Sequence, residues 1–290
     1  MKGLVMEGGA MRGMFTCGVL DVLMENNVTF DGAAGISAGA VFGCNFKSRQ
    51  IGRGIRYNKK YANDKRYCSV KNLITTGDLY GVEFCYHTLP NELDPFDAET
   101  FSKNPMDFYI GATNVTNAEA VFYKCRDGGA RDLEWMRASA SMPVVSKVVN
   151  VDGYKLLDGG IVCPVPYAYM QSLGYDKNVI ILTQPKGYRK EKSKMTALMK
   201  PFLRKYPAMV TAMDTRYLTY NKQMDELDKM EETKEALIIR PAESLGISRT
   251  ESNPDELERV YRLGRTEGLC RLNEIREYLK SDFFVDNARE

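Results

Sequence analysis

The sequence has only one histidine, His87, among its 290 residues. It also lacks any apolar run approaching the roughly 20 residues that cross a bilayer, and its first residues do not resemble a signal peptide. Basic and acidic residues nearly balance, 40 against 38, so the net charge of +2 gives no general attraction to nucleic acid. These absences lead us to expect a cytoplasmic protein without a nucleic-acid partner.

Paired cysteines are also missing. The seven cysteines are widely spaced and contain no C-x-x-C pair, which argues against a disulfide framework and against a structural zinc site. We expect most of them to be small buried side chains, and we expect neither a metal nor a cofactor.

The hydrophobic pattern alternates between strands and helices from the start of the chain. A strand at residues 3–6, a glycine-rich turn and a helix are followed by a strand at 30–36 and a helix from about Ala38. This order is typical of a parallel sheet with crossover helices. Further strands are predicted at 107–114, 119–124, 147–157, 178–183 and 236–240. Further helices are predicted at 132–139, 195–203, 207–232 and 254–280, with short helices and loops over 48–105. The last helix carries Gly264 and Gly268 on its apolar face, which would permit close packing.

The segment Gly35-Ile36-Ser37-Ala38-Gly39 matches G-x-S-x-G, the nucleophile elbow, at a predicted strand-to-helix turn. A sharp turn there lifts the Ser37 side chain to the carboxyl edge of the sheet. Gly35 and Gly39 are expected because the backbone of such a turn is crowded. Ser37 is therefore a candidate nucleophile.

A second glycine-rich turn, Gly8-Gly9-Ala10-Met11-Arg12-Gly13, also follows a strand and opens a helix. Its backbone amides could bind a phosphate or a tetrahedral oxyanion. It lacks the G-K-[ST] ending of a P-loop and has Ala10 where the dinucleotide fingerprint has glycine. If the two strands are neighbours, this loop and the Ser37 turn open on one sheet edge, as an oxyanion hole requires.

The third motif is Asp158-Gly159-Gly160, after a predicted strand, where two glycines would let the chain turn tightly beside another loop. A Ser-Asp-His triad in α/β-hydrolase order needs a histidine after the acid. His87 precedes Asp158, so that triad cannot be assembled, and we expect His87 to lie at the surface or at a helix start. A Ser37–Asp158 pair is the economical alternative, although an aspartate with a pKa near 4 is a weak base.

In this order the three motifs resemble the patatin-like phospholipase family, and Ala138-Ser139-Ala140-Ser141-Met142-Pro143 is similar to its A-S-x-x-x-P segment. The resemblance covers roughly residues 1–185. It implies a three-layer α/β/α fold with a mostly parallel sheet, and a Ser–Asp dyad that hydrolyses acyl esters of lipids. Ser37 would attack the acyl carbonyl and Asp158 would accept its proton. Amides around Gly9 and Ala10 would hold the oxyanion, with Ala10 a departure from the glycine of many members.

Two alternatives stay open beside a phospholipase A or lysophospholipase activity. One is a thioesterase or small-ester carboxylesterase, and the other is a non-catalytic lipid-binding module. Arg12 could meet a lipid phosphate or tie its loop to the fold through a salt bridge.

Residues 186–290 match no family that the sequence suggests, and we expect them to complete the domain formed by the core, 1–185. A basic run lies near an apolar helical face. The basic run is either a solvated loop or a patch that contacts an anionic membrane surface. The apolar residues either belong to the core or form a face that lies on a bilayer or covers the active site as a lid. The basic residues are Lys186, Arg189, Lys190, Lys192 and Lys194, and the apolar residues are Met195, Leu198, Met199 and Phe202. The oligomeric state is left open.

Overall fold

The computed structural model describes residues 1–193 and 196–281, and its centre is one eight-stranded sheet. The strand order is β5-β6-β3-β2-β1-β7-β8, with β4 paired to β3. The pairs β2–β3, β1–β2, β1–β7 and β7–β8 are parallel, whereas β4 and β6 run antiparallel to β3. The strands are β1 (Lys2–Met6), β2 (Gly32–Ile36), β3 (Asp107–Asn114), β4 (Glu119–Lys124), β5 (Val149–Val151), β6 (Tyr154–Asp158), β7 (Lys177–Ile181) and β8 (Ala236–Ile239).

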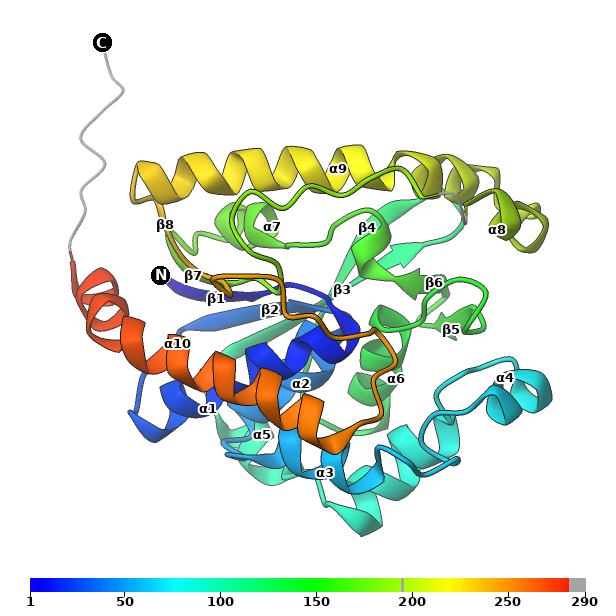
Figure 1. Cartoon of the computed structure of the whole chain (residues 1–290), viewed down its shortest axis with the longest axis horizontal. Helices are drawn as coiled ribbons and strands as arrows, with labels where there is room; N and C mark the ends of the chain where they lie inside the picture. Colours follow the sequence, from blue (N-terminus) through cyan, green and yellow to red (C-terminus); the bar gives the residue numbers. More distant parts are fainter. Residues whose placement is uncertain (194–195, 282–290) are drawn as a thin grey trace.

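Helices cover both faces of this sheet (Figure 1). One face is covered by α1 (Gly13–Glu25), α2 (Ala38–Lys47) and α10 (Pro254–Lys280), and the other by α7 (Tyr167–Ser172) and α9 (Pro207–Glu232). Alternate residues of β1 pack on opposite faces of the sheet. Leu4 and Met6 belong to the hydrophobic core beneath α1, α2 and α10, and Val5 belongs to the core beneath α7 and α9. The expected three-layer α/β/α fold with a mostly parallel sheet is confirmed.

The remaining helices are short. They are α3 (Arg53–Tyr61), α4 (Val70–Thr76), α5 (Ala98–Lys103), α6 (Ala130–Ser139) and α8 (Thr196–Leu203), with a wide helical turn at Phe84–Leu93. The short helices expected over 48–105 are therefore present. Within the described residues, no helix is both long and apolar enough to cross a membrane.

Glycines set the distance between α1 and α10. A Cβ on Gly264 would lie 2.0 Å from the Phe15 carbonyl oxygen, and one on Gly18 would lie 2.1 Å from the Tyr261 carbonyl oxygen. Neither distance is compatible with a side chain, so the two helix backbones touch at these points. The close packing expected at Gly264 is confirmed.

The prediction of one strand over 147–157 is wrong. Two strands, β5 and β6, form an antiparallel hairpin there. The turn is Asp152-Gly153, with φ values of 52° and 80°. Consecutive left-handed residues, often Asp-Gly, are the signature of a tight hairpin turn whose twist matches that of the strands.

All seven cysteines are free, three of them buried and Cys270 exposed.

Candidate active site

The glycine loop and the Ser37 turn open on the same edge of the sheet. Their strands, β1 and β2, are parallel neighbours, with Met6 opposite Gly35. A Cβ on Gly8 would lie 3.0 Å from the Ser37 Cβ, so the loop passes directly against the turn. The neighbouring strands that the oxyanion-hole hypothesis required are therefore present.

The turn at Ser37 is tight and strained. Ser37 has φ 53° and ψ −120°, outside the regions that suit a side chain. A Cβ on Gly35 would lie 2.4 Å from the Gly39 carbonyl oxygen, and a Cβ on Gly39 would lie 2.4 Å from that of Met6. The Ser37 amide donates to the Ser139 hydroxyl (2.8 Å), which donates to the Gly111 carbonyl oxygen (2.6 Å). Ser139, which in the sequence is only one residue of the A-S-x-x-x-P segment, thus anchors the turn.

Strand β3 brings Asp158 to Ser37. One edge of β3 pairs with β4 over residues 109–114, so both other partners must share the opposite edge. On that edge, β2 ends with Ile36 opposite Gly111, and β6 ends with Asp158 opposite Ala112. The carboxyl ends of β2 and β6 therefore meet head to head. Ser37, the residue after β2, and Asp158 line one pocket.

The Asp158 carboxyl group is buried, with only 2% of the residue exposed. It accepts a hydrogen bond from the Gly160 amide at 2.7 Å. Burial raises the pKa of Asp158, while Arg216 and a hydrogen bond with the Ser37 side chain act in the opposite direction. The pKa of Asp158 is raised overall, which makes this carboxylate a stronger base than an exposed aspartate.

The glycine loop follows the carboxyl end of β1. Gly8, Gly9, Ala10 and Arg12 line the pocket, and a short 3₁₀ turn over Ala10–Arg12 leads through Gly13 into α1. Met11 is buried in the core. In the part of the chain that the structure describes, the amides of Gly8 and Gly9 have no recorded acceptor. Ala10 has φ 50°, a left-handed conformation that glycine adopts without cost.

Glu7 is a site residue that sequence reasoning missed. Its carboxylate is buried and accepts hydrogen bonds from the Thr183 amide and hydroxyl and from the Tyr220 hydroxyl (3.0 Å). It therefore fastens the start of the glycine loop to the end of β7 and to α9. In sequence it is one acid before a turn, and nothing marks it as buried.

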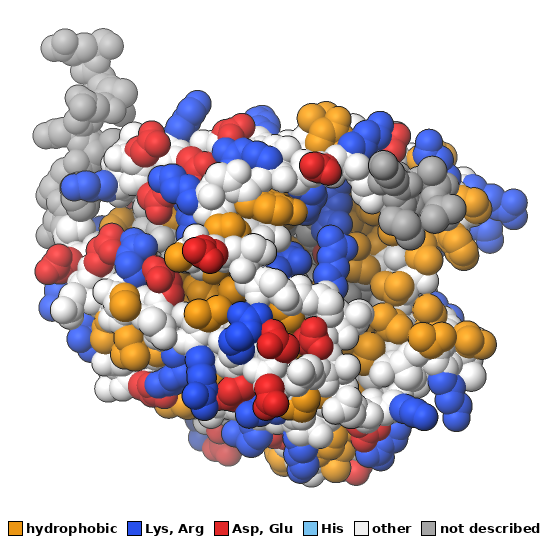
Figure 2. Space-filling view, viewed as in Figure 1, with side chains coloured by type: hydrophobic (Ala, Val, Ile, Leu, Met, Phe, Trp, Pro, Cys, Tyr) orange, Lys and Arg blue, Asp and Glu red, His pale blue; other side chains and the backbone are white. Residues whose placement is uncertain are grey.

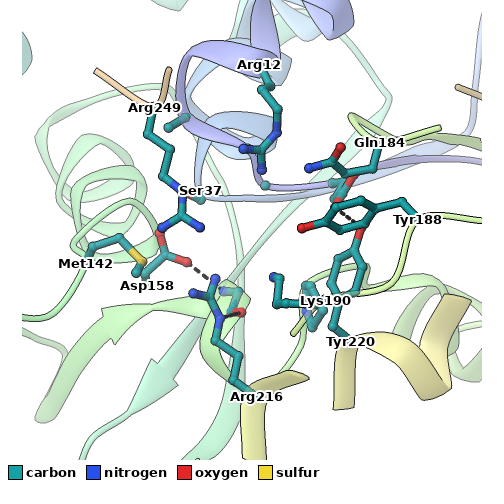
Figure 3. A pocket seen from close by; sticks show the side chains of 16 residues that line it. Arg12, Ser37, Met142, Asp158, Gln184, Tyr188, Lys190, Arg216, Tyr220 and Arg249 are labelled. Carbon is teal, nitrogen blue, oxygen red and sulfur yellow. Dashed lines mark hydrogen bonds between the residues drawn. The ribbon is translucent and has the colours of Figure 1, made fainter. Parts of the chain in front are cut away.

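The pocket above Ser37 is small and partly open to solvent. Several walls come from beyond residue 185, where no motif in the sequence marks individual residues as part of the site. These walls are Tyr188, Lys190, Arg216, Tyr220 and Arg249. Figure 3 shows the side chains of Arg12, Lys190, Arg216 and Arg249 directed toward the space beside Ser37 and Asp158. Figure 2 shows Lys and Arg side chains at a hollow below α9, with apolar side chains beside it.

Arg12 and His87 differ in their relation to this pocket. Arg12 forms no ion pair with any residue that the structure describes, and its buried Nε atom has no hydrogen-bond partner there. Of the two alternatives for Arg12, the salt bridge that ties its loop to the fold is therefore absent from that part. His87 is exposed on the turn Phe84–Leu93, outside the pocket.

The basic run after β7 divides into several environments. Lys186 pairs with Glu231, and Arg189 pairs with Asp225 and Asp228, all on α9. Lys190 lines the pocket, and Lys192 is exposed. Lys194, Met195 and the side chain of Leu198 lie outside the described residues. Phe202 on α8 is 67% exposed. The contact with an anionic membrane stays a prediction.

Fold and site together define an α/β protein with a serine elbow beside a buried aspartate. No cluster of three metal-ligating side chains occurs within residues 1–193 and 196–281. The patatin-like phospholipase family matches residues 4–169, and this chain belongs to that family. A second match, over residues 206–280, is to a domain of unknown function, DUF6363.

Among curated proteins, the chain is 28% identical over 188 residues to the uncharacterized protein YjjU of Escherichia coli, covering 63% of this chain and 52% of YjjU. It is 26% identical over 254 residues to lysophospholipase NTE1 of Coccidioides immitis, covering 82% of this chain and 16% of that protein. The chain thus spans about half of one relative and a sixth of the other. The solved structure of VipD from Legionella pneumophila aligns over 94% of this chain and 67% of VipD, with 15% identity and a TM-score of 0.47.

Proposed function

We propose that this chain is a serine acyl hydrolase that cleaves acyl esters of lipids through a Ser37–Asp158 dyad. The observation that carries the proposal is the head-to-head meeting of β2 and β6, which brings Ser37 and Asp158 to one pocket. Family membership and the lysophospholipase name of the NTE1 relatives support a lipid ester as the substrate.

In the proposed reaction, the Ser37 hydroxyl oxygen attacks the acyl carbonyl carbon while its proton passes to the Asp158 carboxylate. Collapse of the tetrahedral intermediate breaks the ester bond, and Asp158 returns the proton to the leaving alcohol. Water then attacks the acyl-serine by the same route in reverse and releases the fatty acid. The raised pKa of Asp158 supports its role as base, because proton transfer is most efficient when the pKa of the base approaches the working pH.

The oxyanion would be held by backbone amides that need no rearrangement during the reaction. The amides of Gly8 and Gly9 are candidates because they line the pocket and have no recorded acceptor within the described residues. The amide of Ala38, the first residue of α2, is a further candidate, since the first amides of a helix lack intrahelical partners.

A fluorophosphonate probe, which forms a covalent bond with an activated serine, tests the nucleophile. We expect labelling of the wild type and of Ser172→Ala, an exposed serine on α7, and none of Ser37→Ala. Labelling that persists in Ser37→Ala would refute the assignment. Absence of labelling in the folded wild type would instead favour a lipid-binding module.

Asp158→Asn tests the base. The amide keeps an oxygen for the Gly160 hydrogen bond but cannot accept the serine proton, so we expect turnover to fall at least about 100-fold, the lower range for general-base catalysis. Near-normal turnover would eliminate the dyad. Fatty-acid release from phospholipid vesicles, compared with release from soluble p-nitrophenyl esters and acyl thioesters, separates a lipid hydrolase from a small-ester esterase or a thioesterase.

A further inference from the structure

The pocket is lined by four cationic side chains and only two carboxylates. Arg12, Lys190, Arg216 and Arg249 all line it, and none of them forms an ion pair with any residue that the structure describes. Cations just outside behave differently, since Lys186, Arg189 and Arg240 are each paired with acids of α9. The lack of partners is therefore a property of the pocket.

The two carboxylates that line the pocket accept their hydrogen bonds from other groups, although Asp158 and Arg216 lie close enough to affect each other's pKa. Glu7 accepts hydrogen bonds from Thr183 and Tyr220, and Asp158 accepts one from the Gly160 amide. The four cations and these two acids give the lining a formal net charge of +2 while Lys190 is protonated. A dianion would balance it.

Two of the cations are held in place by contacts with uncharged groups. Arg216 donates from Nε to the Gly160 carbonyl oxygen at 2.8 Å, and the Lys190 ammonium lies 4.1 Å from the centre of the Tyr220 ring. Burial, and then the charge of Arg216, lower the pKa of Lys190 to about 7. Such crowding of like charges in a partly buried pocket favours binding of an anion that relieves it.

Most of this cluster comes from outside the segment that matches the patatin-like family. Lys190 follows β7, Arg216 lies on α9 and Arg249 follows β8, all beyond residue 169. Arg216 and Arg249 lie within the region of unknown function, residues 206–280. That region thus contributes charge directly beside Ser37 (Figure 3).

Resting on the function proposed above, we propose that this cluster is the subsite for a phosphate monoester on the acyl-ester substrate. The chain then prefers lipids with a bare phosphate head group, such as phosphatidic or lysophosphatidic acid, over lipids with a choline head group. A phosphate monoester carries close to two negative charges at pH 7, and guanidinium groups bind phosphate oxygens through paired hydrogen bonds. A choline cation would meet a lining in which cationic side chains outnumber carboxylates four to two.

Selectivity between two matched substrates tests the proposal. Lysophosphatidic acid and lysophosphatidylcholine with the same acyl chain, in neutral detergent micelles, are compared by kcat/KM. We expect the wild type to favour the phosphate monoester by at least about 10-fold, or about 1.4 kcal/mol. Arg249→Gln should lower this ratio at least about 10-fold, whereas Lys192→Gln, on the exposed loop, should leave it unchanged. A preference for the choline lipid, or a ratio that Arg249→Gln does not alter, would overturn the proposal.

Binding to Ser37→Ala separates this inference from the hydrolase proposal. Isothermal titration with monomeric lysophosphatidic acid and with inorganic phosphate should show both to bind, the lipid at least about 10-fold more tightly, and Arg249→Gln should weaken both. Equal affinities would indicate a site for free phosphate, and no binding would mean that there is no anion subsite; either result overturns the substrate assignment. If the wild type hydrolyses no ester but these affinities hold, the hydrolase proposal fails while the phosphate subsite stands.

Discussion

Lys190→Met should stabilise the fold at neutral pH. Lys190 is the pocket cation whose charge costs most, because burial and the nearby Arg216 lower its pKa from 10.5 to about 7. One pKa unit corresponds to about 1.4 kcal/mol, so retaining this charge costs the folded state up to about 4 kcal/mol at pH 7. Methionine keeps the length of the stem beside Tyr220 without the charge.

The sign of the pH dependence follows from proton binding. Between pH 7 and 10.5 the unfolded chain holds a proton at Lys190 that the folded chain has released, so wild-type stability at this site rises with pH. The methionine variant has no such proton. Its advantage should be full below about pH 7 and should disappear as the pH approaches 10.5.

Urea denaturation at pH 6.5, 8 and 9.5 measures this difference, with Lys192→Met on the exposed part of the same loop as the control. Phosphate buffers are avoided, because an anion in the pocket would reduce the cost of the Lys190 charge. A variant less stable than the wild type at pH 6.5, or a gain that does not change with pH, would refute the account of Lys190 as a repelled, half-buried cation.

Two further predictions concern backbone geometry. Ala10 has φ 50°, so Ala10→Gly should change the free energy of unfolding by less than about 1 kcal/mol. The β-branched Ala10→Val should lower it by about 1–3 kcal/mol. Equal effects of the two substitutions in urea denaturation would contradict a strained backbone at Ala10. Gly264→Ala would set a Cβ 2.0 Å from the Phe15 carbonyl oxygen, against 3.3 Å for the nearest atom to Gly268→Ala. We expect a loss of about 2 kcal/mol or more only at Gly264, and equal losses would mean that the two helices do not touch there.

Much of the fold could be predicted from the sequence because its signals are local. The strands β1, β2 and β7 are buried on both faces, which gives short apolar runs. Glycine turns follow β1 and β2, where the backbone is crowded. The long helices α9 and α10 match their predicted ranges, with proline in the first turn of each. The β5–β6 hairpin differs from the single predicted strand because a turn of only two residues, Asp152-Gly153, divides one strand-like run.

The residues of the candidate site could be predicted from the sequence, but their meeting in space could not. Ser37, Asp158 and the glycine loop stand in short motifs whose residue types follow from backbone constraints, so the sequence predicts them as a set. The sharing of one β3 edge by β2 and β6, which brings Ser37 to Asp158, is a matter of strand pairing across about 120 residues. No local pattern records it.

By itself, the sequence determined a parallel α/β fold with a serine turn, a glycine loop and an Asp-Gly-Gly turn, because each depends on neighbouring residues. Only the tertiary structure decided that Lys190, Arg216 and Arg249 line the same pocket as Ser37. In the chain these cations look like ordinary surface residues, and Lys190 belongs to a basic run in which Lys186 and Arg189 pair with α9 and Lys192 faces solvent. Whether a cation is paired or opposed by like charge depends on what folding brings beside it, and that information is not local.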